Sequence, residues 1–136
     1  MSRSGYSDDY DQWALIRWRG AVTSAIRGKR GQAFLKEMAA ALDAMPEKVL
    51  ISDELEQDGA VCALGSVGKA RGMDMSNLDP YEYETIAPAF GIPEALAREI
   101  MYENDEDYRQ ETPEERWQRI RRWVQRQIAE EPRING

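Results

Sequence analysis

Apolar residues recur at helical spacing through the first third of the chain. Two stripes stand out: Leu15, Trp18, Val22, Ala25 and Ile26, which Trp13 extends by one turn, and then Phe34, Leu35, Met38, Leu42 and Met45. Spacings of three and four residues are typical of helices that bury one face. We therefore predict two antiparallel helices, the first from Ser7 to about Arg27 and the second ending at Pro46, joined by a tight basic connector from Gly28 to Gly31.

The middle of the chain predicts further helices. Residues 61–71 are rich in small side chains and end at Gly72, which indicates a helix packed closely against its neighbours. Asp79 and Pro80 predict the start of a helix that runs through Phe90, and Pro93 predicts another that runs to about Asn104. Val49 to Ile51 is too short to distinguish a strand from a helix edge, so residues 47–60 receive no assignment.

The clearest local signal is a capping box near the C-terminus. Thr112 supplies the cap, Pro113 the first helical position and Glu115 the returning carboxylate. The helix is expected to reach about Ala129, with a buried face formed by Trp117, Ile120, Val124 and Ile128 and with Trp123 beside it. At 136 residues and 42% hydrophobic content, residues 1–136 fit one all-α domain of about six helices. Residues 1–8 and 131–136 are expected to be flexible ends.

Charge is sorted along the chain, which carries a net charge of −7. Between Gln12 and Lys36 there are six basic residues and no carboxylate, whereas Glu37 to Glu115 holds twenty carboxylates and five basic residues. Such sorting favours contact between one face and a charged macromolecule. The candidate binding residues are Arg17, Arg19, Arg27, Lys29 and Arg30, with a second basic row formed by Arg116, Arg119, Arg122 and Arg126. The alternative is that these cations pair with the acidic middle of the same fold.

Composition argues against several classes of site. The chain has no histidine, which removes the commonest general base and zinc ligand, so we expect no enzyme, no cofactor and no metal site. Cys62 is the single cysteine, expected as a buried core residue in a reducing cytoplasm. No apolar run approaches the roughly 20 residues of a membrane span, so we expect a cytoplasmic protein without membrane contact.

Three motif matches are incomplete. Residues 86–100 have the spacing of a helix-turn-helix, but its second helix offers Glu94, Glu99 and Glu103 against a single Arg98, so helix packing is the preferred interpretation. Residues 65–70 lack the first glycine and the final hydroxyl of a phosphate loop. Residues 103–107 alternate carboxylates but lack the glycine and the closing glutamate of a calcium loop.

Several segments together resemble small proteins of tailed bacteriophages and prophages. They include Ser2 to Asp9, Trp13 to Gly20 and Ser24 to Leu35, and the resemblance continues through Pro46, Cys62 to Gly65, Asn104 and Asp105 to Thr112 and Pro113, which is nearly the full chain. The last three of these features are also similar to uncharacterised bacterial helical domains. The resemblance implies a phage gene product acting in a bacterial cytoplasm, and it carries over no catalytic residue.

These observations favour a phage accessory protein that binds a host or phage macromolecule, a protein above all, through a charged face and so inhibits a host defence or enzyme. One alternative is direct nucleic-acid binding through the basic first helix and the connector from Gly28 to Gly31. Another is an acidic mimic of DNA that uses residues 99–107. Self-association through Trp13 or Trp123 also stays open.

Overall fold

The computed structural model describes residues 12–105 and 110–129, and over these ranges the protein is all-α with one small sheet. The elements are α1 (Gln12–Arg27), α2 (Lys29–Ala44), β1 (Glu56–Gln57), β2 (Ala60–Val61), α3 (Ala63–Arg71), α4 (Tyr83–Phe90), α5 (Glu94–Asp105) and α6 (Pro113–Gln127). The predicted all-α class is thereby confirmed. The expected flexible ends and the helix start at Ser7 fall outside the described residues.

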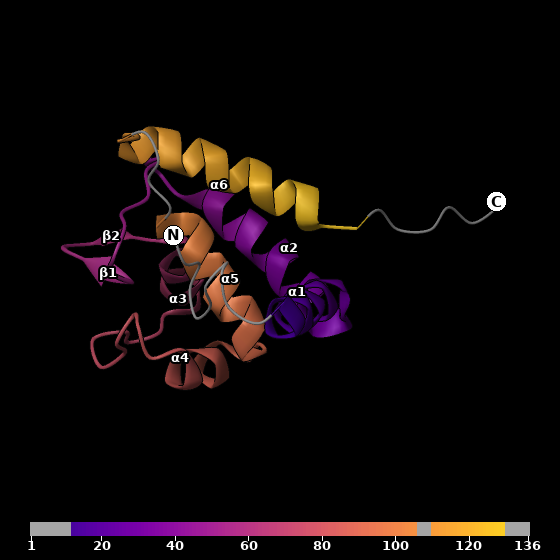
Figure 1. Ribbon diagram of the computed structural model, residues 1–136. Coiled ribbons are helices and arrows are strands. Elements are labelled where there is room, and N and C mark those ends of the chain that lie inside the picture. Colours follow the sequence, from indigo (N-terminus) through magenta and orange to yellow (C-terminus); the bar gives the residue numbers. More distant parts are fainter. Residues whose placement is uncertain (1–11, 106–109, 130–136) are drawn as a thin grey trace.

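The helices surround α5, which runs through the middle of the structure (Figure 1). Helix α5 contacts α1, α3, α4 and α6, while α2 packs against α1, α3 and α6. Apolar side chains from all these helices and from the segments between them form the core. The largest fully buried side chains include Phe90, Leu35, Met38, Leu42, Leu50, Leu64, Ile86, Leu96, Ile100, Met101 and Ile120. The apolar stripe predicted for α2 is thus the side that faces the core.

Helices α1 and α2 meet at a corner. The predicted basic connector is wrong in extent, because Gly28 alone separates the helices and Lys29, Arg30 and Gly31 belong to the first turns of α2. In Figure 1, α1 is seen nearly end-on and α2 runs across the view, so the expected antiparallel pair is also wrong. Gly31 explains the sharp bend, since a Cβ there would overlap the carbonyl oxygen of Ala25. Only glycine lets the two backbones approach so closely.

The segment without a sequence assignment is extended and ends in a hairpin. Strands β1 and β2 pair antiparallel, and the turn between them has positive φ at Asp58 (53°) and Gly59 (86°). An Asp-Gly pair is a strong hairpin signal because both residues accept this backbone geometry. The extended chain before the hairpin is tied to the fold by hydrogen bonds from the N–H of Leu50 to the Pro113 carbonyl (3.1 Å) and of Ile51 to the Val61 carbonyl (2.9 Å).

Helix α3 is the closely packed helix that its small residues predict. The Sγ of Cys62 caps its N-terminus by accepting a hydrogen bond from the N–H of Gly65 (3.4 Å), and Gly72 ends it in the left-handed conformation (φ 73°). A Cβ at Gly65 would overlap the Leu55 carbonyl oxygen. The glycine therefore lets α3 lie directly against the extended segment, and its packing offsets the low helix propensity of glycine.

Helices α4, α5 and α6 differ little from the predicted bounds. Helix α4 begins at Tyr83 instead of at Pro80, because Asp79 forms a turn in which its carboxylate accepts from the N–H of Tyr81 (2.9 Å). Helix α6 opens with the predicted capping box between Thr112 and Glu115. Helix α5, the second helix of the helix-turn-helix match, has buried residues along most of its length, which fits the packing interpretation.

Candidate interaction surface at the corner of α1 and α2

The cations of α1 and of the start of α2 lie at the protein surface. The apolar stripe of α1 faces inward, and the side chains that point away from it include the candidate binding residues. All five are exposed, and none forms an ion pair with a described residue: Arg17, Arg19, Arg27, Lys29 and Arg30. The alternative that these cations pair with the acidic middle of the chain therefore does not hold within residues 12–105 and 110–129.

Helix α1 is fixed in this orientation by contacts with α5. The guanidinium of Arg98 lies 4.8 Å from the ring centre of Trp18 and 5.1 Å from that of Tyr83. A cation held between two aromatic rings contributes about 0.5–2 kcal/mol, depending on its desolvation. Because Trp18 turns toward α5, the opposite side of α1 faces outward.

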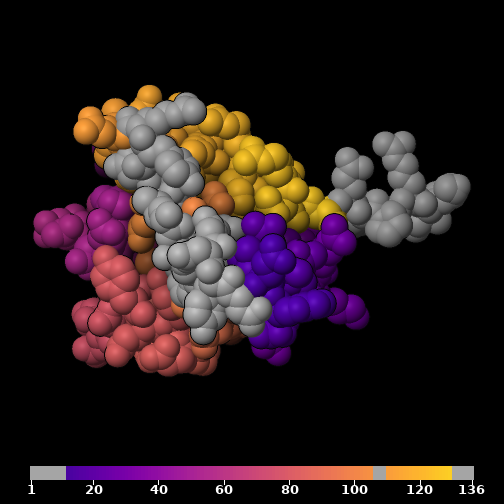
Figure 2. Space-filling model, viewed as in Figure 1, coloured from indigo at the N-terminus to yellow at the C-terminus, as the bar shows by residue number. Residues whose placement is uncertain are grey.

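Gln32 joins three helix ends at the corner. Its side-chain Nε2 donates to the carbonyl of Ile26 in α1 (2.8 Å) and to that of Gln127 at the end of α6 (3.0 Å). Its Oε1 accepts from the N–H of Ala129 (2.8 Å). Figure 2 shows the yellow end of α6 meeting the indigo atoms of this region. No local sequence pattern marks Gln32 for this role, because two of its partners, Gln127 and Ala129, lie 95 and 97 residues away in the sequence.

The corner therefore collects cations from three helices. Arg27 and Arg126 are sequence neighbours of Ile26 and Gln127, the residues whose carbonyls accept from Gln32. Lys29 and Arg30 lie in the same helical turn as Gln32. All four side chains are exposed. We call this set, Arg27, Lys29, Arg30 and Arg126, the basic corner. Arg17 and Arg19 are also exposed, nearer the N-terminal end of α1, and lie outside this set.

The second basic row predicted for α6 is partly wrong. Arg116 is 5% exposed, and its guanidinium donates to the carbonyls of Asn104 (3.0 Å) and Leu50 (3.2 Å). Arg119 forms a close ion pair with Glu111 (2.6 Å). These two residues sit at positions of the helix that face α5 and the extended segment, so they serve the fold. Arg122 and Arg126 remain exposed, as predicted.

Two other arginines neutralise carboxylates of α2. Arg71 forms a bidentate ion pair with Glu37, with two hydrogen bonds of 2.7 Å each. Arg121 forms a bidentate ion pair with Asp43, with hydrogen bonds of 2.8 and 2.9 Å. The hydrogen bonds from these guanidiniums lower the pKa of Glu37 and of Asp43 below their ordinary values. Acidic residues of α2 are therefore neutralised by α3 and α6, and the cations of α1 play no part.

Helix α1 also exposes two large apolar side chains beside its cations. Trp13 is 68% exposed and Ile16 is 57% exposed. The prediction that Trp13 extends the buried stripe of α1 is therefore wrong. Trp123, the other tryptophan considered for self-association, is 7% exposed and belongs to the core. Surface aromatic residues beside arginine are enriched at protein interfaces. The outer face of α1 thus combines apolar and cationic groups.

The carboxylates considered for DNA mimicry are largely enclosed. Glu99 is 9% exposed, and Glu103 lies 3.8 Å from Arg119. Burial raises the pKa of Asp105, whose carboxylate also accepts from the N–H of Asp53 (3.1 Å). These three groups do not form an open acidic face. Residues 106 and 107 of the proposed region lie outside the described residues.

The described residues offer no alternative chemical centre of the kinds considered from the sequence. Cys62 is buried, as predicted, and burial raises the pKa of its thiol to about 12. Within 12–105 and 110–129 there is no group of three or more cysteine or carboxylate side chains placed to hold a metal ion. The helices in the same ranges are too short or too polar to cross a bilayer.

Comparison with known proteins found no matching family model, no similar curated protein and no similar solved structure.

Proposed function

We propose that this protein is a phage-encoded accessory protein of the bacterial cytoplasm, whose basic corner binds an acidic surface of a host or phage protein without catalysing a reaction. One observation carries the proposal. In a chain with a net charge of −7, the cations at this corner make no ion pair with any described carboxylate. The phage origin is supported only by the resemblance of residues 2–35 and of the later motifs.

The position of two of these cations supports a role in binding. Lys29 and Arg30 occupy the first turn of α2, where the partial positive charge of the helix N-terminus disfavours them. That turn contains no carboxylate, and Gly28 provides no side-chain cap. The placement opposes helix stability by about 0.3–1 kcal/mol per cation at low ionic strength. A bound acidic group would interact favourably with both the helix N-terminus and the two cations, and so it would offset this loss of helix stability.

The neighbouring apolar groups favour a protein as the partner. Ile16 and Trp13 offer contacts that a protein interface buries, and the arginines around them match a carboxylate-rich rim. Nucleic acid is the second candidate, because an exposed tryptophan beside Arg17 also suits stacking on an unpaired base. The two candidates differ in their response to salt, since binding to a phosphate backbone weakens steeply as counterions are added.

The test compares wild-type protein with two double charge reversals. Lys29→Glu with Arg30→Glu changes the basic corner, and Lys48→Glu with Lys69→Glu makes the same change in net charge on the side of the hairpin. Each protein is immobilised and exposed to nuclease-treated bacterial lysate at about 50 and 150 mM salt. We expect one protein to be retained by the wild type and by the control variant and to be lost from the corner variant.

Two outcomes would overturn the proposal: retention of no protein at either salt concentration, or equal retention by both variants. The nucleic-acid alternative is tested separately with fluorescent single-stranded and duplex oligonucleotides. If the wild type binds an oligonucleotide with an affinity that falls steeply with salt and is lost in the corner variant, that alternative replaces the protein partner.

A further inference from the structure

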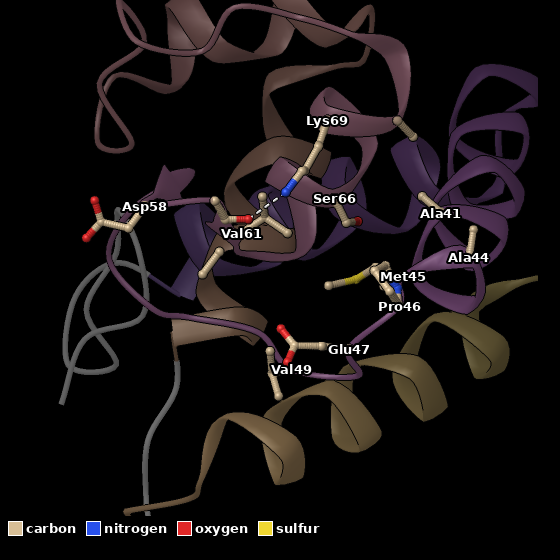
Figure 3. Close-up of a pocket in the computed structure, with 13 residues that line it drawn as sticks. Ala41, Ala44, Met45, Pro46, Glu47, Val49, Asp58, Val61, Ser66 and Lys69 are labelled. Carbon is tan, nitrogen blue, oxygen red and sulfur yellow. Dashed lines mark hydrogen bonds between the residues drawn. The ribbon is translucent and has the colours of Figure 1, made fainter.

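A hollow of about 450 Å³ lies on the side of the molecule that carries the hairpin. Its walls come from the end of α2, the extended segment that follows, the hairpin and α3 (Figure 3). Small residues create it, because Ala44, Ala60 and Ala70 leave space that larger side chains would fill. Its volume is within the range of about 300–1,000 Å³ that small-molecule sites occupy.

The inner surface of the hollow is mostly apolar. Met45 extends its thioether into the space, and Val49 and Val61 contribute further apolar surface. Met45 is an adaptable wall, since its unbranched side chain adjusts to the shape of what it contacts. These groups provide a place for an apolar body such as an aliphatic or aromatic side chain.

Two opposite charges face each other across this apolar space. The ammonium of Lys69 is held at one side by donating to the carbonyl of Gly59 (2.6 Å), and it retains two further N–H donors. The carboxylate of Glu47 lies on the other side, while Asp58 points away (Figure 3). Neither Lys69 nor Glu47 forms an ion pair with any residue in the described ranges. The hollow therefore presents one cation and one anion, each available to a charged group of a ligand.

We propose that this hollow binds a zwitterion with an apolar side chain, of the kind represented by a free apolar α-amino acid. The ligand carboxylate accepts from Lys69, its ammonium donates to Glu47, and its side chain lies among Met45, Val49 and Val61. A ligand with one charge engages only one of these two exposed groups, so simple amines and simple carboxylates gain less from the site than a zwitterion does. The site is separate from the basic corner and independent of the proposed function.

The test is calorimetric titration of the full-length protein with L-leucine, L-methionine and L-phenylalanine, followed by N-acetyl-L-leucine and L-leucinamide. The last two compounds each lack one of the two charges. We expect at least one of the amino acids to bind, and both leucine derivatives to bind about tenfold more weakly than leucine or worse. No binding of any amino acid at millimolar concentration would overturn the proposal, as would binding of either derivative as tightly as leucine.

Single substitutions test whether the amino acid binds in the hollow. Ala70→Leu fills the hollow from an exposed position on α3, and Ala89→Leu makes the same change at an exposed position on α4. We expect Ala70→Leu to abolish binding and Ala89→Leu to retain it. Lys69→Gln should remove the preference for leucine over leucinamide, and Glu47→Gln should remove the preference for leucine over its acetyl derivative. Binding that survives Ala70→Leu unchanged would place the ligand elsewhere and refute the assignment.

Discussion

The Nε of Arg116 donates to the backbone carbonyl of Asn104 at 3.0 Å, and this bond links α6 to the end of α5 inside the protein. The same guanidinium reaches the carbonyl of Leu50 at 3.2 Å. Asn104 is itself fully buried, accepting from the N–H of Ala63 and donating to the Ile51 carbonyl, both at 2.9 Å. These two side chains hold the otherwise irregular extended segment against the helices.

Replacement of Arg116 is therefore expected to destabilise the protein strongly. Arg116→Ala leaves two buried carbonyl oxygens without their donors, so the free energy of unfolding should fall by about 3 kcal/mol. Arg122→Ala, an exposed arginine on the same helix, is the control and should change stability by less than about 0.5 kcal/mol. Urea denaturation followed by circular dichroism measures both. Similar stabilities for the two variants would contradict the internal role of Arg116.

The corner between α1 and α2 predicts opposite effects for two glycine substitutions. Gly31→Ala places a Cβ against the Ala25 carbonyl and should lower the free energy of unfolding by about 1–3 kcal/mol. Gly20→Ala, within α1, meets no atom within 4 Å and should raise it by about 0.4–1 kcal/mol. Thermal and urea unfolding test both predictions. If Gly31→Ala is as stable as Gly20→Ala, the two helices do not approach as described.

Charge reversal at the start of α2 should separate stability from binding. Lys29→Glu and Arg30→Glu place acidic groups at the positive end of the helix, so each should raise the free energy of unfolding by about 0.3–1 kcal/mol at low salt. The gain should shrink as salt is added. A loss of stability in these variants would show that the two cations contribute to the fold, which removes one support for the proposed function.

The thiol of Cys62 provides a test through pH. Burial raises its pKa from an ordinary value of 9.0 to about 12, so the native thiol keeps its proton to higher pH than the unfolded thiol. The contribution of this group to stability is fully present below about pH 9 and is lost as the pH rises from there toward 12. Over this range, Cys62→Ala should show a shallower fall of stability with pH than the wild type.

The same burial should protect Cys62 from modification. We expect a thiol reagent such as dithionitrobenzoate to react slowly with the native protein at pH 8 and rapidly once urea unfolds it, because the thiolate is the reacting species. Equal rates with and without urea would show that Cys62 is accessible in the native state.

Local signals in the sequence determined much of the secondary structure. The capping box of Thr112 and Glu115 and the helix end at Gly72 were readable because their chemistry involves residues only a few positions apart. The Asp58 and Gly59 turn carried an equally local signal that was missed. The Gly28 to Gly31 connector was misjudged because the pair of glycines suggested a turn, whereas Gly31 serves a close contact between helices.

Only the tertiary structure determined whether each charged side chain is buried, paired or exposed. The arginines of α1 and α6 looked alike in sequence, yet Arg116 became an internal support, Arg119 a partner of Glu111, and Arg126 part of the exposed corner. The reason is physical: the free energy of a charge depends on its burial and on its neighbours in space. Those neighbours come from distant positions, as with Arg121 and Asp43, which lie 78 residues apart. Helical periodicity told which residues share a face, and packing alone determined what each face meets.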